Sequence, residues 1–413
     1  MQKVFYRFTV WLYQLGIRLV SPWNTKARLW LQGRKQFPVF NHESKPCIWV
    51  HCASLGEFEQ GRPVLEALKN QYPNYPVMLS FFSPSGYEVR KNYPGADTVF
   101  YLPSDSPGHA EKLINTMNPA LVIWVKYEYW YYYLSTLYKK GVPVLLISGI
   151  FRPSQPFFKW YGAFWRKMLV PFQLLFVQNY DSYQLLKSIG ITNGIVAGDT
   201  RFDRVVEIAE KKKQVPHIES FTENFPVVVA GSTWEEDEVE WMHFVRMHPG
   251  VRFIFAPHVV TSERINAMKK TFPEAITYSQ LSANAEIAIG CHILIIDNIG
   301  MLSALYQYAQ ITYIGGGFGN DGIHNTLEAA VYGKPVVFGP EYQKFAEAVE
   351  LVKIGAAFPV SSAIALEKIV THLLNQRESC EQAGKAARQF VYQQKGATET
   401  ILAYVAEKRL LTN

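Results

Sequence analysis

YIGGGFGNDGIHNTLEAAVYGKPVVFGP, residues 313–340, has the order of elements that a parallel sheet requires. An apolar strand runs into a glycine-rich loop, a helical segment follows, and a second apolar strand, PVVFGP, closes the unit. Parallel strands need a crossover of this kind, because a tight turn joins only antiparallel neighbours. The stretch therefore predicts an α/β fold.

The same alternation continues on the N-terminal side of this stretch. Apolar runs separated by amphipathic helical stretches indicate a parallel sheet that is covered on both faces. The runs are CIWVH (47–51), PVMLSFF (76–82), TVFYLP (98–103), ALVIWV (120–125), PVLLIS (143–148), LLFVQ (174–178), PVVVAGS (226–232), VRFIFAPH (251–258), HILIID (292–297) and QITYIGGG (310–317). We predict two doubly wound domains that face each other across a cleft, with ligands bound outside the carboxyl ends of the strands.

Domain boundaries follow from changes in composition. The stretch EIAEKKKQVPHIESFTENFP, residues 207–226, is charged and contains helix breakers, so we predict that it is a linker. The predicted parts are a basic amphipathic segment at 1–42, an N-terminal Rossmann-like domain at 43–206, a C-terminal Rossmann-like domain at 227–380, and helices at 381–413 that pack back on the N-terminal domain.

The composition excludes several classes of protein. With 413 residues, of which 48% are hydrophobic and 18% charged, the chain is long and apolar enough to bury two cores and is not disordered. Its cysteines, Cys47, Cys52, Cys291 and Cys380, form neither a CxxC pair nor a cluster with histidine. We expect free, mostly buried thiols in a reducing compartment and no structural zinc.

The positive charge is concentrated at the N-terminus. The chain has 41 Lys and Arg against 35 Asp and Glu, and its first 42 residues contain seven of the cations and no acid. The remainder is almost neutral, which argues against a nucleic acid as a partner.

Residues 4–20, VFYRFTVWLYQLGIRLV, predict an amphipathic helix at a membrane surface. Arg7, Gln14 and Arg18 share one side of this helix, and most aromatic and aliphatic side chains lie elsewhere. Such a helix suits the headgroup region of an anionic leaflet, and the stretch is too short and too charged to predict a membrane span. The alternative is a helix packed on its own domain.

The glycine-rich loop is a candidate anion site. The glycines at 315–317 permit positive φ angles and close backbone approach, and a helix is predicted to begin near His324 and Asn325 with free N–H groups for a nucleotide phosphate. Glu328, one turn later, is placed to accept hydrogen bonds from ribose hydroxyls. The alternative is a purely structural turn.

Strand ends in the first half also carry polar residues. Glu57 lies at the start of a helix and is either a general base for a hydroxyl or a carboxylate that complements the helix dipole. Ser54 is a candidate cap of the same helix. Ser83, Ser85 and Gly86 form either an anion cradle or an ordinary helix start.

Three further strand ends complete the candidate site. Lys126 and Glu128 follow one strand, Ser232 and Thr233 in AGST either bind phosphate or cap a helix, and His258 either meets a phosphate or is structural. Because no Asp-x-Asp motif flanks these ends, we predict a metal-independent enzyme without a cofactor. Helix dipoles and backbone donors would then stabilise a leaving nucleotide.

Taken together, the motifs resemble one family along essentially the whole chain. They are HCASLGE (51–57), SPSGYE (83–88), Glu128 with Trp130, GDTRFD (198–203), AGSTWEEDE (230–238), the glycine loop with HNTLEAAVYGKPVVFGP (324–340), and the basic N-terminal helix. In these motifs the sequence resembles the 3-deoxy-D-manno-octulosonic acid (Kdo) transferases of lipid A biosynthesis.

The resemblance implies a GT-B fold and a specific reaction. Such an enzyme moves Kdo from CMP-Kdo, with inversion at the sugar, to the lipid A precursor lipid IVA, a tetraacyldisaccharide 1,4'-bisphosphate. The resemblance also implies a place on the cytoplasmic face of the inner membrane of a Gram-negative bacterium.

Residue by residue, the resemblance assigns Glu57 as the catalytic base and Glu128 as a second essential carboxylate. With the strand-end residues above, the candidate site for the CMP-sugar comprises Ser232, Thr233, Pro257, His258, Gly315, Gly316, Gly317, His324, Asn325 and Glu328. The candidate site for the acceptor comprises Ser54, Gly56, Ser83, Ser85, Gly86 and Lys126.

Two positions depart from the pattern of the family. The family usually has an acidic residue where Lys126 stands and an arginine where His258 stands, which leaves the phosphate contact of His258 open. Arg264 or Lys334 is the candidate for the missing cation.

Two alternative functions remain. One is another GT-B enzyme, either a transferase for a different nucleotide sugar or an epimerase. The other is a catalytically inactive nucleotide-binding protein at the membrane. The presence of both Glu57 and Glu128 argues against the inactive protein, and the basic N-terminal helix beside a neutral body favours a lipid acceptor.

Overall fold

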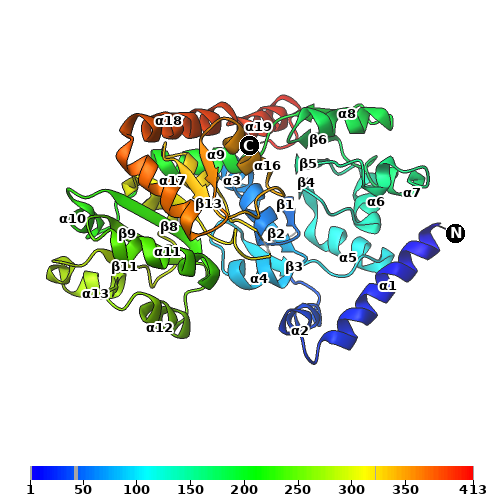
Figure 1. Ribbon diagram of the computed structural model, residues 1–413. Helices are drawn as coiled ribbons and strands as arrows, with labels where there is room; N and C mark the ends of the chain where they lie inside the picture. Colours follow the sequence, from blue (N-terminus) through cyan, green and yellow to red (C-terminus); the bar gives the residue numbers. More distant parts are fainter. Residues whose placement is uncertain (1, 41–44, 321, 413) are drawn as a thin grey trace. The chain divides into compact units, whose positions relative to one another are not determined.

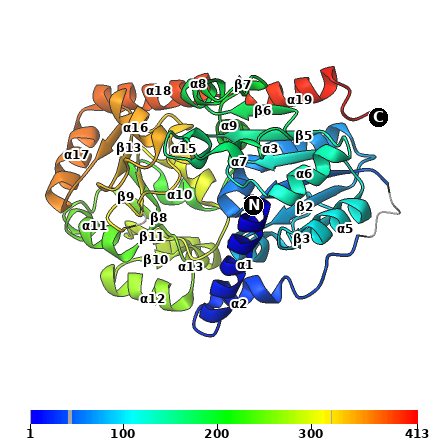
Figure 2. The same cartoon turned by 90° about the vertical axis from the view of Figure 1, so that its right-hand side faces the viewer.

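The computed structural model describes residues 2–40, 45–320 and 322–412 and divides into two compact units. Unit 1 consists of Met1–Asp203 and Lys395–Asn413, and unit 2 consists of Arg204–Gln394. Each unit contains a parallel sheet with helices packed around it (Figure 1, Figure 2). The prediction of two parallel-sheet α/β domains is therefore confirmed.

The sheet of unit 1 has the strand order β3-β2-β1-β4-β5-β6-β7. The strands are β1 (Cys47–Cys52), β2 (Val77–Phe81), β3 (Thr98–Tyr101), β4 (Pro119–Val125), β5 (Val144–Gly149), β6 (Leu174–Val177) and β7 (Gly194–Val196). The chain builds outward from β1 in one direction and then, from β4, in the other. The order therefore reverses between β1 and β4, as in a Rossmann sheet.

The helices of unit 1 are α1 (Gln2–Val20), α2 (Thr25–Gln32), α3 (Leu55–Gln71), α4 (Pro84–Arg90), α5 (Pro107–Met117), α6 (Tyr131–Lys139), α7 (Ala163–Arg166), α8 (Tyr180–Ser188) and α19 (Ala397–Glu407). Helix α9 (Thr200–Glu210) begins in unit 1 and continues into unit 2.

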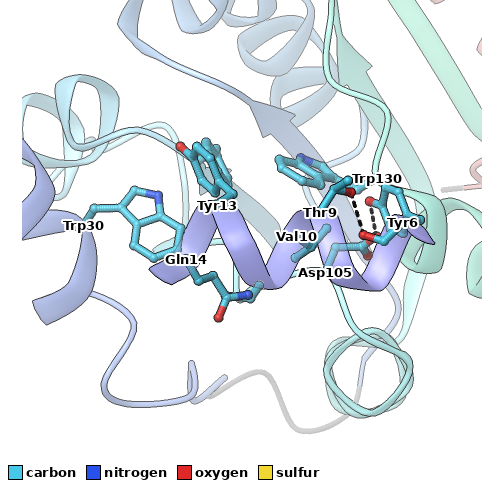
Figure 3. A pocket seen from close by; sticks show the side chains of 10 residues that line it. Tyr6, Thr9, Val10, Tyr13, Gln14, Trp30, Asp105 and Trp130 are labelled. Atoms are coloured by element: carbon cyan, nitrogen blue, oxygen red, sulfur yellow. Dashed lines mark hydrogen bonds between the residues drawn. The ribbon is translucent and has the colours of Figure 1, made fainter. Parts of the chain in front are cut away.

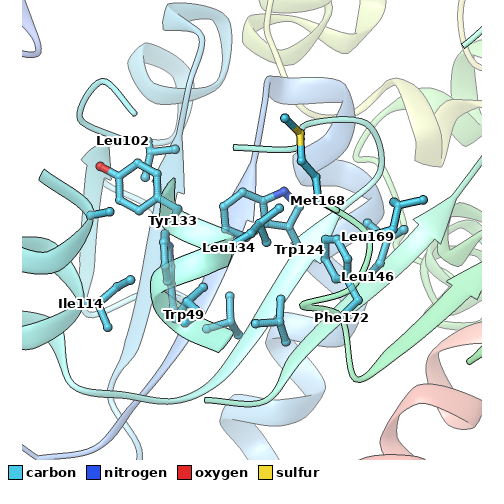
Figure 4. Packing of buried hydrophobic residues seen from close by; sticks show 14 of the residues in the cluster. Trp49, Leu102, Ile114, Trp124, Tyr133, Leu134, Leu146, Met168, Leu169 and Phe172 are labelled. Carbon is cyan, nitrogen blue, oxygen red and sulfur yellow. The ribbon is translucent and has the colours of Figure 1, made fainter. Parts of the chain in front are cut away.

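Alternate residues of the central strands β1, β2, β4, β5 and β6 in unit 1 enter two separate cores. Trp49 and Trp124 pack with α5 and α6 on one face, where Figure 4 shows them among aromatic and aliphatic side chains. Ile48 and Val50 pack on the other face with α3 and α19. Because successive side chains of a strand point to opposite faces, a strand buried on both sides reads as the unbroken apolar run that predicted it.

The sheet of unit 2 repeats this topology with the order β10-β11-β9-β8-β12-β13-β14. Its strands are β8 (Val227–Thr233), β9 (Arg252–Pro257), β10 (Ile276–Thr277), β11 (Ile293–Ile295), β12 (Ile311–Ile314), β13 (Val336–Phe338) and β14 (Ala357–Pro359). Its helices are α10 (Ile218–Thr222), α11 (Glu235–Met247), α12 (Ser262–Thr271), α13 (Tyr278–Ala283), α14 (Leu302–Leu305), α15 (Leu327–Ala330), α16 (Ala346–Lys353), α17 (Ala363–Asn375) and α18 (Arg377–Gln393). The order reverses between β8 and β12.

The structure divides the chain at slightly different points from those predicted. The division falls after Asp203 and after Gln394, where the sequence suggested 206 and 380. Of the C-terminal helices predicted to pack on the N-terminal domain, α18 therefore belongs to unit 2 and only α19 joins unit 1. Residues 207–226, predicted as a linker, contain the end of α9 and all of α10 and lie in unit 2, because α10 buries Ile218 and Phe221. The predicted boundary at 42–43 lies outside the described residues.

Helix α1 forms where the amphipathic segment was predicted. Its side chains include exposed apolar residues such as Phe5, Phe8 and Trp11. In the described parts of the chain, no helix combines the length and the apolar character needed to cross a membrane. The association of α1 with a membrane surface stays a prediction.

Candidate active site

The predicted site residues gather where the strand order reverses in each sheet. In unit 1, Glu57 follows β1 and Glu128 follows β4, which are neighbours across the reversal. In unit 2, Ser232 is the second-last residue of β8 and Gly316 follows β12, and these strands are again neighbours across the reversal. Doubly wound sheets bind ligands outside the carboxyl ends of strands at this point.

Glu57 lies in the first turn of α3, and its carboxylate accepts a hydrogen bond from Ser54 Oγ. Ser54 is the N-cap residue of α3, but its side chain makes no capping hydrogen bond. A side chain at Gly56 would lie 3.8 Å from Ser54 Oγ, an ordinary contact. Glu57 is half-buried, so its carboxylate is accessible to a ligand. The position lets the carboxylate complement the helix dipole, and its role as a general base stays a prediction.

Glu128 belongs to a chain of buried hydrogen bonds that the sequence analysis did not predict. His51 Nε2 lies 2.9 Å from Glu128 Oε2, and His51 Nδ1 lies 2.8 Å from Ser80 Oγ. Trp49 Nε1 donates to Ser80 Oγ at 2.8 Å, and Trp130 Nε1 donates to Glu128 Oε2 at 3.0 Å. His51 is fully buried, whereas the side chain of Glu128 is 18% exposed. The network thus ends at one carboxylate that a ligand can reach.

The donors in this network determine which nitrogen of His51 carries the proton. A carboxylate oxygen only accepts, so Nε2 must donate to Glu128. The hydroxyl of Ser80 receives the Trp49 N–H, and its own proton is free to point at Nδ1 of His51. A neutral His51 protonated at Nε2 satisfies all of these contacts. The signal in the sequence was a histidine inside the otherwise apolar run CIWVH.

The candidate acceptor residues surround these two carboxylates at neighbouring strand ends. Ser83 N–H donates to Ala53 O at 2.7 Å, which joins the end of β2 to the end of β1. Ser83 also caps α4 through the Ser85 N–H. A side chain on Gly86 would collide with the ring of Phe81, so this glycine is needed for packing.

Lys126 adopts a backbone conformation that side chains rarely tolerate. Its φ angle is 69°, directly after β4, and its Nζ lies 4.8 Å from the centre of the Tyr127 ring. Strained residues of this kind concentrate at functional sites. The structure therefore places Lys126 beside Glu128 on a turn that only a specific local arrangement stabilises.

Arg34, which the sequence analysis did not single out, holds α2 against the ends of β2 and β3. Its guanidinium donates to Leu102 O at 2.8 Å and to Phe82 O at 2.7 Å, and it lies 3.9 Å from the Trp30 ring centre. Burial lowers the pKa of this arginine to about 10, which leaves it charged at neutral pH. No local pattern in the sequence separates Arg34 from its basic neighbours, because its partners come from distant strands.

In unit 2 the structure brings the candidate nucleotide-binding residues together. His258 N–H donates to Thr233 O at 3.0 Å, and His324 N–H donates to Gly315 O at 3.1 Å. The rings of His258 and His324 stack at 4.2 Å, and the ring of Trp234 stacks on His258 at 4.8 Å. Pro257 pairs with Thr233 across β8 and β9. An aromatic cluster therefore adjoins the glycine-rich loop.

The glycines of this loop are required for different reasons, close backbone packing at some positions and a positive φ angle at another. A side chain at Gly315 would meet the backbone of Ser232 and Thr233, and one at Gly317 would meet the backbone of Gly339. Gly316 has a φ angle of 93°. Close backbone packing accounts for Gly315 and Gly317, which supports the structural interpretation of these two positions without excluding a ligand at the loop.

Asp237, which the sequence analysis missed, holds the glycine loop in place. Its carboxylate accepts from Gly316 N at 2.8 Å, from Trp234 N at 2.8 Å and from the Tyr313 hydroxyl at 2.7 Å. Burial raises the pKa of this carboxyl, and these hydrogen bonds oppose the rise. Asp237 is one of four consecutive acids, and nothing local marks it as the one that turns inward.

The side chains considered as cations for a phosphate are either already paired with an acid or made less basic by burial. Arg264 forms an ion pair with Glu238 at 2.5 Å, and Thr233 donates its hydroxyl to the same carboxylate at 2.8 Å. Burial lowers the pKa of His258 and of Lys334. Burial thus favours the neutral form of His258, and the backbone N–H groups of the loop are the better candidates for an anion.

The helix after the glycine loop starts later than predicted and is short. α15 begins at Leu327, and Asn325 Oδ1 accepts from its first N–H at 3.2 Å. Asn325 Nδ2 donates to Glu328 at 3.0 Å. The N-cap residue is Thr326, and Asn325 before it binds the first N–H of the helix and orients Glu328, two roles that the expected start near His324 did not include.

Comparison with known sequences identifies one family. Residues 26–204 match the family described as 3-deoxy-D-manno-octulosonic-acid transferase (kdotransferase). A 3-deoxy-D-manno-octulosonic acid transferase of Haemophilus influenzae is 26% identical over 86% of this chain and 85% of its own length. The transferase of Aquifex aeolicus is 27% identical over 81% of this chain and 88% of its own length.

Comparison with solved structures extends the likeness in fold to both units. UDP-GlcNAc 2-epimerase from Neisseria meningitidis, bound to UDP-GlcNAc, matches with a TM-score of 0.61 and 18% identity over 88% of this chain and 100% of that chain. At this level of identity the likeness concerns the fold alone, which is GT-B-like.

Proposed function

This chain belongs to the 3-deoxy-D-manno-octulosonic acid (Kdo) transferase family and is a glycosyltransferase, and on that premise we propose that it transfers Kdo from CMP-Kdo to a lipid A precursor. The observation that carries the proposal is the placement of Glu57 and Glu128 at the reversal point of one sheet and of the glycine-rich loop at the reversal point of the other. The proposed acceptor is lipid IVA, and the proposed outcome is inversion at the sugar.

In the proposed reaction, Glu57 is the general base. Its carboxylate takes the proton of an acceptor hydroxyl while that oxygen bonds to the anomeric carbon of Kdo. The bond from this carbon to the phosphate oxygen of CMP breaks on the opposite side, and CMP leaves with the electron pair. A single displacement of this kind inverts the anomeric centre. Glu57 is half-buried and accepts a hydrogen bond from Ser54, which fits a base that must face a ligand.

Glu128 has a different proposed role because its surroundings differ. It accepts from the buried His51 and from Trp130, so its carboxylate is held in one orientation. A fixed carboxylate at the end of the strand next to that of the base suits recognition of acceptor hydroxyls. We therefore assign Glu128 to positioning of the acceptor.

The donor nucleotide is proposed to lie on the unit 2 loop. Backbone N–H groups near Gly316 would face the phosphate, and Asn325 and Glu328 would face the ribose. Asp237 keeps the loop in shape from the protein side. These contacts need no metal ion, in line with the metal-independent reaction proposed here.

The acceptor never leaves the bilayer, so the enzyme is proposed to work at the cytoplasmic face of the inner membrane. The support is α1, which carries Lys3, Arg7 and Arg18 beside exposed aromatic side chains. Cations attract anionic lipid headgroups, and aromatic rings suit the interface.

The test is mass spectrometry of the lipid after incubation of the full chain with CMP-Kdo and lipid IVA. The wild type should add whole Kdo masses, whereas Glu57→Gln should lower the rate by about 10²–10⁴-fold, the usual share of a general base, while CMP binding survives. Glu59→Gln is the matched control, because Glu59 lies on the same helix and pairs with Arg90 at 2.8 Å.

Two outcomes would contradict the proposal. An unchanged lipid despite CMP binding would remove the acceptor assignment. Conversion of the nucleotide sugar to an epimer without transfer would favour the epimerase alternative.

A further inference from the structure

A cavity of about 340 Å³ lies in unit 1 beside α1. α1 forms one wall, and the opposite wall comes from α2 and from loops at the carboxyl ends of the strands (Figure 3). The cavity is lined by Tyr6, Thr9, Val10, Tyr13, Gln14, Trp30, Phe82, Ser104, Asp105 and Trp130. Its volume is at the lower end of the roughly 300–1,000 Å³ of small-ligand sites.

Contacts at two places attach α1 to the rest of unit 1, one on either side of this space. The Tyr6 hydroxyl donates to Asp105 at 2.6 Å and accepts from Tyr131 N–H at 3.2 Å. Two turns later, Tyr13 packs against Phe82 and Trp30 with ring centres 6.0 Å apart. Val10 lies between these two attachments and points into the cavity (Figure 3).

The lining selects an uncharged, apolar ligand. Among the described residues that line the cavity, only Asp105 is charged, and both of its oxygens already accept hydrogen bonds, from Tyr6, Tyr132 and Tyr133. No lysine or arginine of the described chain lines it. A phosphate would meet no cation there to offset its charge, whereas a hydrocarbon chain can pack on Val10 and on the aromatic rings of the lining.

One lining residue connects the cavity to the candidate active site. The Trp130 side chain forms part of the cavity wall, and its Nε1 donates to Glu128 Oε2 at 3.0 Å. The Trp130 ring also packs on Phe82 with ring centres 4.8 Å apart. The indole ring of Trp130 therefore lies between a ligand in the cavity and Glu128, the carboxylate assigned to positioning of the acceptor.

We propose that this cavity takes one acyl chain of the lipid acceptor and thereby sets where the acceptor's sugar meets Glu128. The proposal rests on the proposed function, because it needs an acylated acceptor. The exposed side of α1 supplies the route. Phe5, Phe8 and Trp11 are 62%, 52% and 53% exposed, so an apolar surface that suits the bilayer lies on the same helix that walls the cavity.

The proposed role of the cavity is to position the acceptor, and it adds little to the binding affinity for the acyl chain. The interior of a bilayer is about as apolar as the cavity, so moving a chain from one to the other gains little free energy. A bound chain instead restricts the orientation of the attached sugar, and such restriction raises the rate of the bound complex. Filling the cavity should therefore lower kcat for an acylated acceptor and leave the KM for the donor unchanged.

Val10→Trp is the variant that fills the cavity, and Val4→Trp is its matched control. Val4 lies on the same helix, is 70% exposed and does not line the cavity. With lipid IVA, Val10→Trp should lower kcat by about tenfold or more, whereas Val4→Trp should not. With the same disaccharide bisphosphate stripped of its acyl chains, Val10→Trp should equal the wild type. An equal loss with both acceptors would overturn the proposal.

A binding measurement decides the proposal even if no Kdo is transferred. A fatty acid with a diazirine at its end is photolysed with the full chain, and labelled peptides are identified by mass spectrometry. The wild type and Val4→Trp should be labelled at the cavity residues of α1 and at Trp130, and Val10→Trp should lose this labelling. Thr9→Phe, a second filling variant, should behave in the same way. Labelling confined to the exposed side of α1, equal in all variants, would refute the acyl-chain site, whereas absent transfer alone would refute only the proposed function.

Discussion

His51 shows how a single buried side chain can govern an exposed carboxylate. It is fully buried, and its two ring nitrogens lie within 2.9 Å of Ser80 and Glu128. The ring does not reach the ligand side itself, so His51 is a positioning residue. Its hydrogen bond holds Glu128 in one orientation, which a flexible carboxylate in water would not keep.

We predict that His51→Leu lowers kcat by about 10–100-fold, because Glu128 loses its internal donor, with the KM for CMP-Kdo unchanged. His51→Gln should recover much of the rate, because the glutamine amide can donate to the same oxygen. Steady-state kinetics on all three proteins provide the measurement. An equal loss in both variants would indicate a packing role instead.

Asp237 has a comparable role at the glycine loop. It accepts three hydrogen bonds, and two of the donors are backbone N–H groups. Asp237→Ala leaves these donors without partners, at a cost of about 1–3 kcal/mol for each. We expect lower thermal stability and weaker CMP binding by calorimetry. Glu236→Gln, an exposed neighbour, is the control, and identical behaviour of the two variants would contradict this role.

Among the elements, α1 depends on a buried carboxylate for its attachment. Asp105 accepts from Tyr6 on α1 and from the first N–H groups of α6. Burial raises the pKa of Asp105 to about 6. A pKa above that of the unfolded chain means that the protonated form favours folding. The stabilising contribution is therefore complete below about pH 4 and is lost as the pH rises through 6.

This shift predicts a pH-dependent difference between the wild type and Asp105→Asn, which cannot ionise. Between pH 4 and pH 7 the wild type should lose about 2 kcal/mol of stability relative to the variant, at about 1.4 kcal/mol per pKa unit. Melting temperatures of both proteins across this range measure the difference. A gap that does not change with pH would contradict the assignment.

At the scale of the whole molecule, the GDTRFD motif (198–203) joins the C-terminal helix α19 to the rest of unit 1. Asp203 accepts from Gly396 N–H at 2.6 Å and from Thr398 N–H at 2.7 Å, which anchors the start of α19. Asp199 accepts from Gln60 on α3 at 2.9 Å. α19 then buries Ile401 and Val405 in the core beside α3. The motif is a junction between three segments far apart in the sequence.

We predict that Asp203→Ala loosens unit 1 and leaves unit 2 intact. Loss of the shared acceptor should speed hydrogen exchange about tenfold in peptides of α19 and α3, which corresponds to about 1.4 kcal/mol. Peptides from α11 and α17 should exchange as in the wild type. Faster exchange throughout both units would show that the motif stabilises the chain as a whole.

Local sequence determined the fold class and where the polar residues of the site would be. A strand buried on both faces has to be apolar throughout, so runs such as CIWVH and ALVIWV indicated parallel strands, and Glu57 and Glu128 followed their ends. The edge strands β7, β10 and β14 were not predicted because they lack a buried apolar run. In β7 both Ile195 and Val196 are exposed, β10 has only two residues, and β14 reads AFP.

Only the tertiary structure decided which side chains meet. His51 and Glu128 are 77 positions apart, and Gln60 and Asp199 are 139 apart, so the strand register and the crossovers bring them together. The same holds for the cavity, where α1 faces loops about a hundred residues away. Composition and periodicity report how each segment is buried, and that property is local. Hydrogen bonds and cavities depend on the distance between segments, which is established only when the chain folds.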